Sequence, residues 1–288
     1  MDYTIKNDYL IATISDNGAE LIKLIDKDNI NRLHDASEKT WNKVSPVLFP
    51  QISKTKDGIY EVDNKIYNMP KHGFFKDMII NPIEVLNDSI TFKITDNEQT
   101  YKIYPYNFEF ELKYELINNS LKVSFKTKNL SNKIMYYMVG GHPALRVPLF
   151  NNEEYEQYYL KFEKKETAEA MQVVDGYLAN VYKPCLNNEN IINLKHDLFK
   201  IDAIVLKNLK SSYVDLCSNV NDRVTRFHFK DFSILAIWSK NIKEADFVCL
   251  EPWNGIQKEF VLKHDKMGVL SLNPNETQEF SYTIEIIK

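Results

Sequence analysis

Residues 107–116, NFEFELKYEL, decide the fold class of this chain. Every second residue from 108 to 116 is apolar or aromatic, and the residues between them are all glutamate or lysine. Side chains of a β-strand alternate between its two faces, so a period of two predicts a strand with one face in the core and one in water. The stretch therefore predicts an antiparallel sheet covered on one side.

The same alternation recurs elsewhere in the chain, at residues 90–94, 121–125 and 280–286. Turn-forming pairs lie between the runs: Asp57-Gly58, Asp63-Asn64, Asn118-Asn119, Asp175-Gly176 and Asn273-Pro274. Short strands separated by such turns are typical of an all-β antiparallel sandwich.

Two runs, SILAIW at 233–238 and FVCL at 247–250, are apolar without interruption. They predict central strands covered on both faces. Residues 151–171 have a helix-forming composition, but the segment YYLKFE at 158–163 also fits a strand, so both structures stay open. No linker, repeat or low-complexity tract interrupts the chain, and we expect one domain over residues 1–288.

Composition excludes several classes of protein. The chain has 288 residues, 44% of them hydrophobic, and a formal net charge of −4. No basic stripe indicates nucleic acid or an anionic membrane, and no apolar stretch approaches the ~18 residues of a membrane span. The three cysteines lack CxxC spacing, which argues against a disulfide framework. We expect a cytoplasmic protein without a signal peptide.

The segment GGHPAL, at 140–145, places two of the eight glycines directly before His142. Glycine lets a ligand or another backbone approach closely, so the pair suits the floor of a pocket. A β-bulge without a ligand is an equal alternative. A second glycine–histidine pair, His72-Gly73, stands in MPKHGFFKD.

The segment CLEPWNG, at 249–255, is the second polar signal. Glu251 follows an apolar run directly, and a carboxylate there is costly unless it is hydrogen-bonded or functional. Trp253 offers a flat face of the kind that pyranose rings contact. A strand end with Glu251 in solvent and Trp253 in the core is the alternative.

Two histidines and a glutamate can bind zinc. The chain has no HExxH motif. His72, His142 and Glu251 are so far apart in the sequence that their spacing neither supports nor excludes a metal site. We expect no metal and no cofactor.

Taken together, these motifs resemble the aldose 1-epimerase (galactose mutarotase-like) superfamily, and within it the short bacterial LacX-like branch. The resemblance covers nearly the whole chain in order, and its most specific pieces are GGHPA and EPWNG. The other pieces are NGAELIKL (17–24), SPVLFP (45–50), DGIY with the segment EVDNKIYNMPKHGF (57–74), YPYNFEF (104–110), NLSNKIMYYMVGGHPAL (129–145) and DAIVL (202–206). The resemblance implies a single-domain antiparallel β-supersandwich with a sugar site in a groove.

The resemblance also implies roles for individual residues. Glu251 matches the general base, His142 the general acid, and His72 a second active-site histidine near the ring oxygen. Asp202 matches a position near the sugar. Gly140 and Gly141 are then expected to make room for a pyranose.

The chain departs from the family at two cationic positions. Lys54 and Lys76 stand where relatives often carry arginine. Lysine keeps the positive charge but loses the planar, bidentate fork of arginine, so the identity of the sugar is less defined than the reaction.

The implied reaction opens an aldose to its aldehyde and recloses it as the other anomer. One group removes the proton of the C1 hydroxyl, and another protonates the ring oxygen. We expect Glu251 to be ionised and His142 protonated at neutral pH. Each charge would favour the other, raising the pKa of His142 and lowering that of Glu251.

Three functions are compatible with these residues. The first is an isomerase, an aldose 1-epimerase of a free hexose that works as a monomer or homodimer. The second is a non-catalytic carbohydrate-binding or sensing module of the same fold. The third is a hexose-6-phosphate 1-epimerase that uses lysines near the groove, namely Lys54, Lys56, Lys71 and Lys76.

Overall fold

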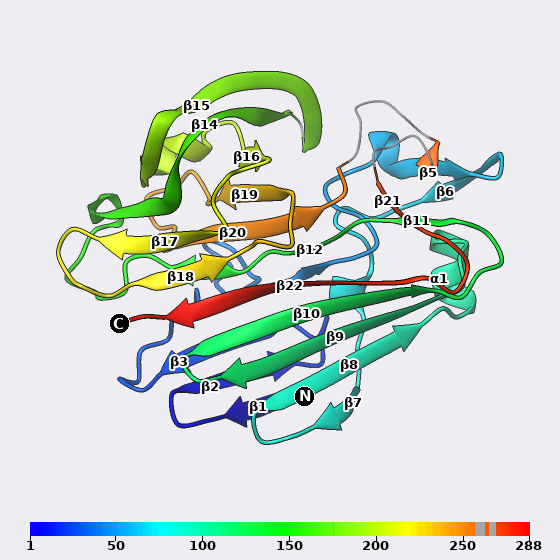
Figure 1. Cartoon of the computed structure of the whole chain (residues 1–288), viewed down its shortest axis with the longest axis horizontal. Coiled ribbons are helices and arrows are strands. Elements are labelled where there is room, and N and C mark those ends of the chain that lie inside the picture. The colour runs from blue at the N-terminus through cyan, green and yellow to red at the C-terminus, as the bar shows by residue number, and fades with distance from the viewer. Residues whose placement is uncertain (175, 257–262, 265–268) are drawn as a thin grey trace.

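The computed structural model describes residues 1–174, 176–256, 263–264 and 269–288. Nearly all regular structure in this part of the chain is antiparallel β-sheet (Figure 1). One short α-helix is present, α1 (Glu98–Ile103). The described residues contain no helix long and apolar enough to cross a membrane.

One 15-stranded sheet dominates the fold. Its main path runs, in spatial order, through β4 (Val47–Leu48), β12 (Val139–Gly141), β20 (Phe247–Asn254), β19 (Ile234–Trp238), β16 (Ile204–Lys207), β14 (Tyr158–Val174), β17 (Tyr213–Ser218), β18 (Thr225–His228), β22 (Thr277–Ile286), β10 (Ser120–Asn129), β9 (Phe108–Ile117), β8 (Ser89–Thr95) and β7 (Pro82–Val85). Two further strands join it from the side: β13 (Ala144–Arg146) pairs with β20, and β15 (Tyr177–Asn193) pairs with β14.

Three small sheets and four short 3-10 turns complete the described structure. The sheets are β1 (Asp2–Lys6) with β2 (Leu10–Ser15) and β3 (Leu21–Asp26), β5 (Ile59–Val62) with β6 (Lys65–Asn68), and β11 (Met135–Tyr137) with β21 (Leu270–Leu272). The 3-10 turns are η1 (Lys56–Gly58), η2 (Phe75–Asp77), η3 (Tyr155–Gln157) and η4 (His196–Phe199).

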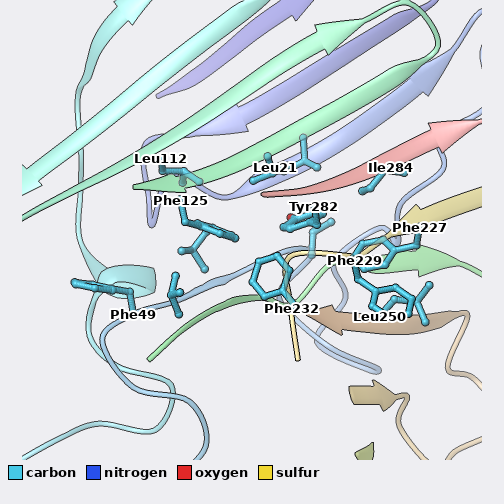
Figure 2. Packing of buried hydrophobic residues seen from close by; sticks show 14 of the residues in the cluster. Leu21, Phe49, Leu112, Phe125, Phe227, Phe229, Phe232, Leu250, Tyr282 and Ile284 are labelled. Atoms are coloured by element: carbon cyan, nitrogen blue, oxygen red, sulfur yellow. The ribbon is translucent and has the colours of Figure 1, made fainter. Parts of the chain in front are cut away.

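The alternation at residues 107–116 is confirmed as β9, in which buried and half-buried residues alternate. β10 continues the pattern, and Val123 lies opposite Tyr114 on one side and Tyr282 on the other. From the segment after β4, the ring of Phe49 stacks on Phe110 with centroids 4.1 Å apart. Figure 2 shows this aromatic core, with Tyr282 near its middle.

Both uninterrupted apolar runs form central strands, as predicted. They are β19 and β20, which pair with each other, and all eight residues of β20 are buried. Of the two structures left open for residues 151–171, the strand is right, because β14 spans most of the segment after η3. β14 and β15 form a long hairpin that arches over one end of the large sheet (Figure 1).

Two histidines in segments that look like polar turns are buried instead. His34 is fully covered, and His264 is 3% exposed. The Asp63-Asn64 turn joins β5 to β6 with positive φ angles at both residues, as a tight hairpin requires. Of the predicted turn at 175–176, Asp175 lies outside the described residues.

The glycine pair before His142 makes room for protein atoms. A β-carbon on Gly140 would lie 2.6 Å from the carbonyl oxygen of Pro252 and 2.8 Å from Cδ1 of Trp253. A β-carbon on Gly141 would lie 2.7 Å from Cε1 of Tyr282. The expectation that the pair clears space for a sugar is therefore wrong, since both positions are filled by neighbouring strands.

We expect Gly140→Ala to destabilise the protein by about 1–3 kcal/mol, because the backbone of β20 cannot yield to the added methyl group without shifting. Urea unfolding followed by circular dichroism measures the difference. Ser124→Ala, at a half-buried strand position on β10, is the control and should stay within about 0.5 kcal/mol of wild type. Equal stability of the Gly140 variant and wild type would contradict the packing argument.

Candidate active site

Three side chains predicted to act in catalysis meet beside β20. Glu251 lies within that strand and is 1% exposed, while His142 directly follows β12 and is 7% exposed. Nε2 of His142 lies 3.1 Å from Oε2 of Glu251. The ring of His72 meets the ring of His142 edge to face, with centroids 5.8 Å apart. The fold therefore brings together residues that are 70 and 109 positions apart (142 − 72 and 251 − 142).

The chain reaches His72 through a left-handed turn. His72 has a φ of 65° and Gly73 a φ of 75°. A side chain on Gly73 would start 2.1 Å from the carbonyl oxygen of Phe49, so only glycine fits there. The backbone N–H of Ser53 donates to Nδ1 of His72 over 3.1 Å. Neutral His72 must then carry its proton on Nε2, which leaves that atom as a donor.

Burial dominates the electrostatics of the site. It lowers the pKa of His142 to about 3, although a hydrogen bond with the residue's own backbone opposes the change. It also lowers the pKa of His72 well below the ordinary value, and the charge of His142 adds to this effect. Burial raises the pKa of Glu251 well above its ordinary value, against the positive charge of Lys71.

The predicted pKa shifts of the pair are thus wrong in direction. Proximity of opposite charges would raise the pKa of His142 and lower that of Glu251, but the loss of water outweighs it. Both shifts favour the uncharged forms, a protonated carboxyl beside a neutral imidazole. Their close atoms are not aligned as a hydrogen bond, and Oε2 of Glu251 has no donor among the described residues.

A cavity of about 470 Å³ opens beside the pair. This volume lies within the range of small-molecule sites in proteins. Six of the predicted site residues line it: His72, Lys76, His142, Asp202, Glu251 and Trp253. The cavity thus collects these side chains around one space.

The predicted cationic positions differ in their relation to this cavity. Lys76 lines it but is ion-paired with Asp77. Lys54 is not among the described lining residues and packs instead against Gly176, where a β-carbon would lie 3.4 Å from Cδ of Lys54. The side chain of Lys56 lies outside what the structure describes.

Trp253 borders the cavity, but only 3% of it is exposed. Its ring packs in an apolar cluster with Leu48, Ile52 and Met138. The expectation that it offers a broad open face to a sugar is therefore wrong.

The lining residues Trp41 and Trp238 were missed by sequence reasoning, whereas Lys71 was among the lysines predicted to lie near the groove. Trp41 is a single aromatic residue in a polar loop, and that isolation was the available signal. Trp238 ends the apolar run of β19, and Lys71 directly precedes His72.

His142, Cys249 and Glu251 place possible metal ligands within 4.8 Å of one another. Burial, followed by the charge of Glu251, raises the pKa of the Cys249 thiol well above its ordinary value. A cysteine binds a metal as the thiolate, so the Cys249 thiol is poorly suited to act as a ligand. We assign no ligand role to these residues.

The low pKa of His142 can be measured directly. We expect nitrogen-15 NMR of the imidazole ring to show a neutral His142 from pH 7.5 down to pH 5, because burial lowers the pKa of His142 to about 3. Repeating the titration with Glu251→Gln separates the effect of burial from that of the coupled carboxyl. A midpoint above 6.5 would overturn the assignment of a neutral resting pair.

Comparison with known proteins finds relatives of the whole chain. Two curated relatives from Lactococcus lactis subsp. lactis, Protein LacX, chromosomal, and Protein LacX, plasmid, are each 33% identical over 299 residues and are matched over the full length of both chains. A galactose mutarotase related enzyme from Lactobacillus acidophilus has a TM-score of 0.95 at 30% identity, covering 100% of this chain and 98% of its own.

A galactose mutarotase-like protein from Lactobacillus casei ATCC 334 has a TM-score of 0.93 at 26% identity, with coverage of 99% of this chain and 100% of its own. These structures confirm the predicted β-sandwich of the galactose mutarotase-like type. The sequence model of the family described as aldose 1-epimerase matches residues 1–285. The chain therefore belongs to the aldose 1-epimerase family.

Proposed function

We propose that the protein is an aldose 1-epimerase that interconverts the α and β anomers of a hexose. The observation that carries the proposal is the 3.1 Å approach of His142 to Glu251 beside the cavity, with His72 next to them. Acid–base catalysis requires groups within roughly 2.6–3.2 Å of the protons they transfer, and each transfer contributes about 10²–10⁴-fold.

The reaction begins with a proton transfer inside the pair. Glu251 passes its proton to Nε2 of His142, which produces a carboxylate base and an imidazolium acid. Hydroxyl groups of a bound sugar take the place of water around these charges and lower the free energy of the charged pair.

Ring opening then uses both charges. Glu251 takes the proton of the C1 hydroxyl, the C1–O5 bond breaks as the C1 carbonyl forms, and His142 gives its proton to O5. The pair returns to its neutral form, so no proton is gained or lost. Rotation about C1–C2 and the reverse transfers close the other anomer.

His72 and Asp202 complete the proposed site. Because Nδ1 of His72 accepts from Ser53, its Nε2–H can donate to the ring oxygen or to a hydroxyl group. Asp202 lines the cavity and can accept from sugar hydroxyls through the oxygen that does not bind the N–H of Ala203. Donors and acceptors of this kind discriminate between sugars by the hydrogen bonds that each sugar completes.

A hexose 6-phosphate is the second candidate substrate, favoured by the lysines of the cavity. Three of them already have partners: Lys43 with Glu20, Lys76 with Asp77, and Lys240 with the carbonyl oxygen of Thr40. Lys54 lies outside the described lining. Lysines that already have protein partners are less available to bind a phosphate, which favours an uncharged hexose as the substrate. A non-catalytic sugar-binding module has no need for a close acid–base pair.

We expect Glu251→Gln to slow mutarotation at least 10²-fold, because the variant has no base for the C1 hydroxyl. Polarimetry on freshly dissolved α-D-glucose and α-D-galactose measures the rate. Glu109→Gln, which alters a surface carboxylate of β9, is the matched control and should keep wild-type activity.

Wild-type rates equal to buffer for both sugars would contradict the proposal for free hexoses. Acceleration with glucose 6-phosphate alone would then identify the phosphorylated substrate, and inactivity on all three would favour the binding module.

Lys71 should set the pH dependence of the reaction. Its positive charge lowers the pKa values of Glu251, His142 and His72. Lys71→Met removes that charge, so the limbs of the pH–rate profile should move to higher pH. Lys71→Arg keeps the charge and should leave them in place. The shift should shrink in high salt, because Lys71 is exposed. Identical profiles for Lys71→Met and wild type would exclude this role.

A further inference from the structure

The ring of His142 is enclosed by tryptophan. The indole of Trp41 lies over it with centroids 4.8 Å apart and an angle of 34° between the planes. Trp238 meets the same imidazole edge to face at 5.8 Å and also contacts Trp41 at 5.5 Å. Trp41 and Trp238 are half-buried and line the cavity. The imidazole is thus covered by the indole of Trp41 and met edge to face by that of Trp238.

The far nitrogen of His142 lacks the usual support. A catalytic histidine is commonly oriented by a hydrogen bond from its second nitrogen to a carboxylate or a carbonyl. Nδ1 of His142 makes no hydrogen bond to another residue in the part of the chain that the structure describes. Apart from the hydrogen bond with its own backbone, the ring is held toward Glu251 by packing, and the two indoles supply part of that packing.

Trp41 is itself held firmly. Nε2 of His34 lies 3.0 Å from the carbonyl oxygen of Trp41, and Nδ1 of His34 lies 2.8 Å from a carboxylate oxygen of Asp246. The N–H of Ser37 donates to the same Trp41 carbonyl over 2.8 Å. A loop fixed by such contacts can hold an indole in one position, which is what support of a catalytic group requires.

We propose that Trp41 is a positioning residue for His142: its indole holds the imidazole in place beside Glu251 and keeps water from the ring face that it covers. The inference rests on the proposed function, since it assigns His142 the role of acid. It adds a residue that does not touch the reacting atoms. Packing takes the place of the hydrogen bond that would otherwise orient the ring.

Trp41→Ala should lower kcat about 10–100-fold with little change in KM, because a misplaced acid affects the chemical step more than binding. Trp41→Phe keeps an aromatic ring on the imidazole and should restore most of the activity. Tyr101→Ala is the matched control, since Tyr101 is an exposed aromatic residue of α1 and is not among the described residues that line the cavity. It should retain the wild-type kcat.

The pH response gives a second readout that needs no substrate. In Trp41→Ala, water reaches the ring, and the NMR midpoint of His142 should rise toward its ordinary value, while Trp41→Phe should stay close to wild type. The groups that face His142 are Glu251 and Cys249 of β20, and His72 and Lys71 of the turn before η2; neither variant changes them.

Three outcomes separate the possibilities. A folded Trp41→Ala protein, by circular dichroism and melting temperature, with wild-type kcat and an unchanged His142 titration would overturn the inference. A raised KM with unchanged kcat would also overturn it, because Trp41 would then contact the sugar instead. If wild type shows no mutarotation but the titration responds to Trp41 as expected, the proposed function fails and the placement of His142 by Trp41 stands.

Discussion

The removal of Glu251 from water is the constraint on which the rest of the site depends. A carboxylate in the middle of a fully buried strand would be costly if it stayed ionised and unpaired. The neighbouring imidazole of His142 is buried as well, and burial favours the uncharged form of both groups. A pair that is neutral at rest and charged only in the presence of a polar ligand stores no uncompensated charge in the core.

The large sheet provides the rigidity that such a pair needs. β20 is held along its length by β19 on one side and by β12 and β13 on the other. Gly140 lets β12 lie close against Pro252 and Trp253 of β20, Gly141 lets it lie close against Tyr282 of β22, and His142 directly follows this strand. The glycines therefore serve the site indirectly, through the backbone rather than by making room for a ligand.

Much of this structure could be predicted from the sequence, for identifiable reasons. Alternation at 107–116 specified β9, and uninterrupted apolar runs specified β19 and β20. A strand buried on one face alternates between apolar and polar residues, whereas a strand buried on both faces is apolar throughout. His72, His142 and Glu251 were singled out by their neighbouring residues, but their roles and their grouping came from the family resemblance, since periodicity carries no information about which strands adjoin. The predictions of one domain and of a monomer or homodimer stay predictions.

The failures share a physical origin, which is that a sequence shows chemical groups but not how much water reaches them. The pKa directions of His142 and Glu251 were wrong because proximity of charge was visible and desolvation was not. Trp253 looked like an open face and is covered, whereas Trp41 stands alone in a polar loop and faces the cavity. Trp41 could be found only once β4, β19 and β20 had been placed around it.

The pairing of β12 with β20 has a consequence for how the molecule folds. Gly140 lies opposite Trp253, 113 positions further along the chain (253 − 140). The β14–β15 hairpin is local in sequence and can form early, but contacts of such long range close late and slowly. The acid and the base belong to segments that adjoin only after this closure. On the proposed function, a nascent chain would be inert toward sugars until Glu251 has been synthesised and β20 has paired with β12.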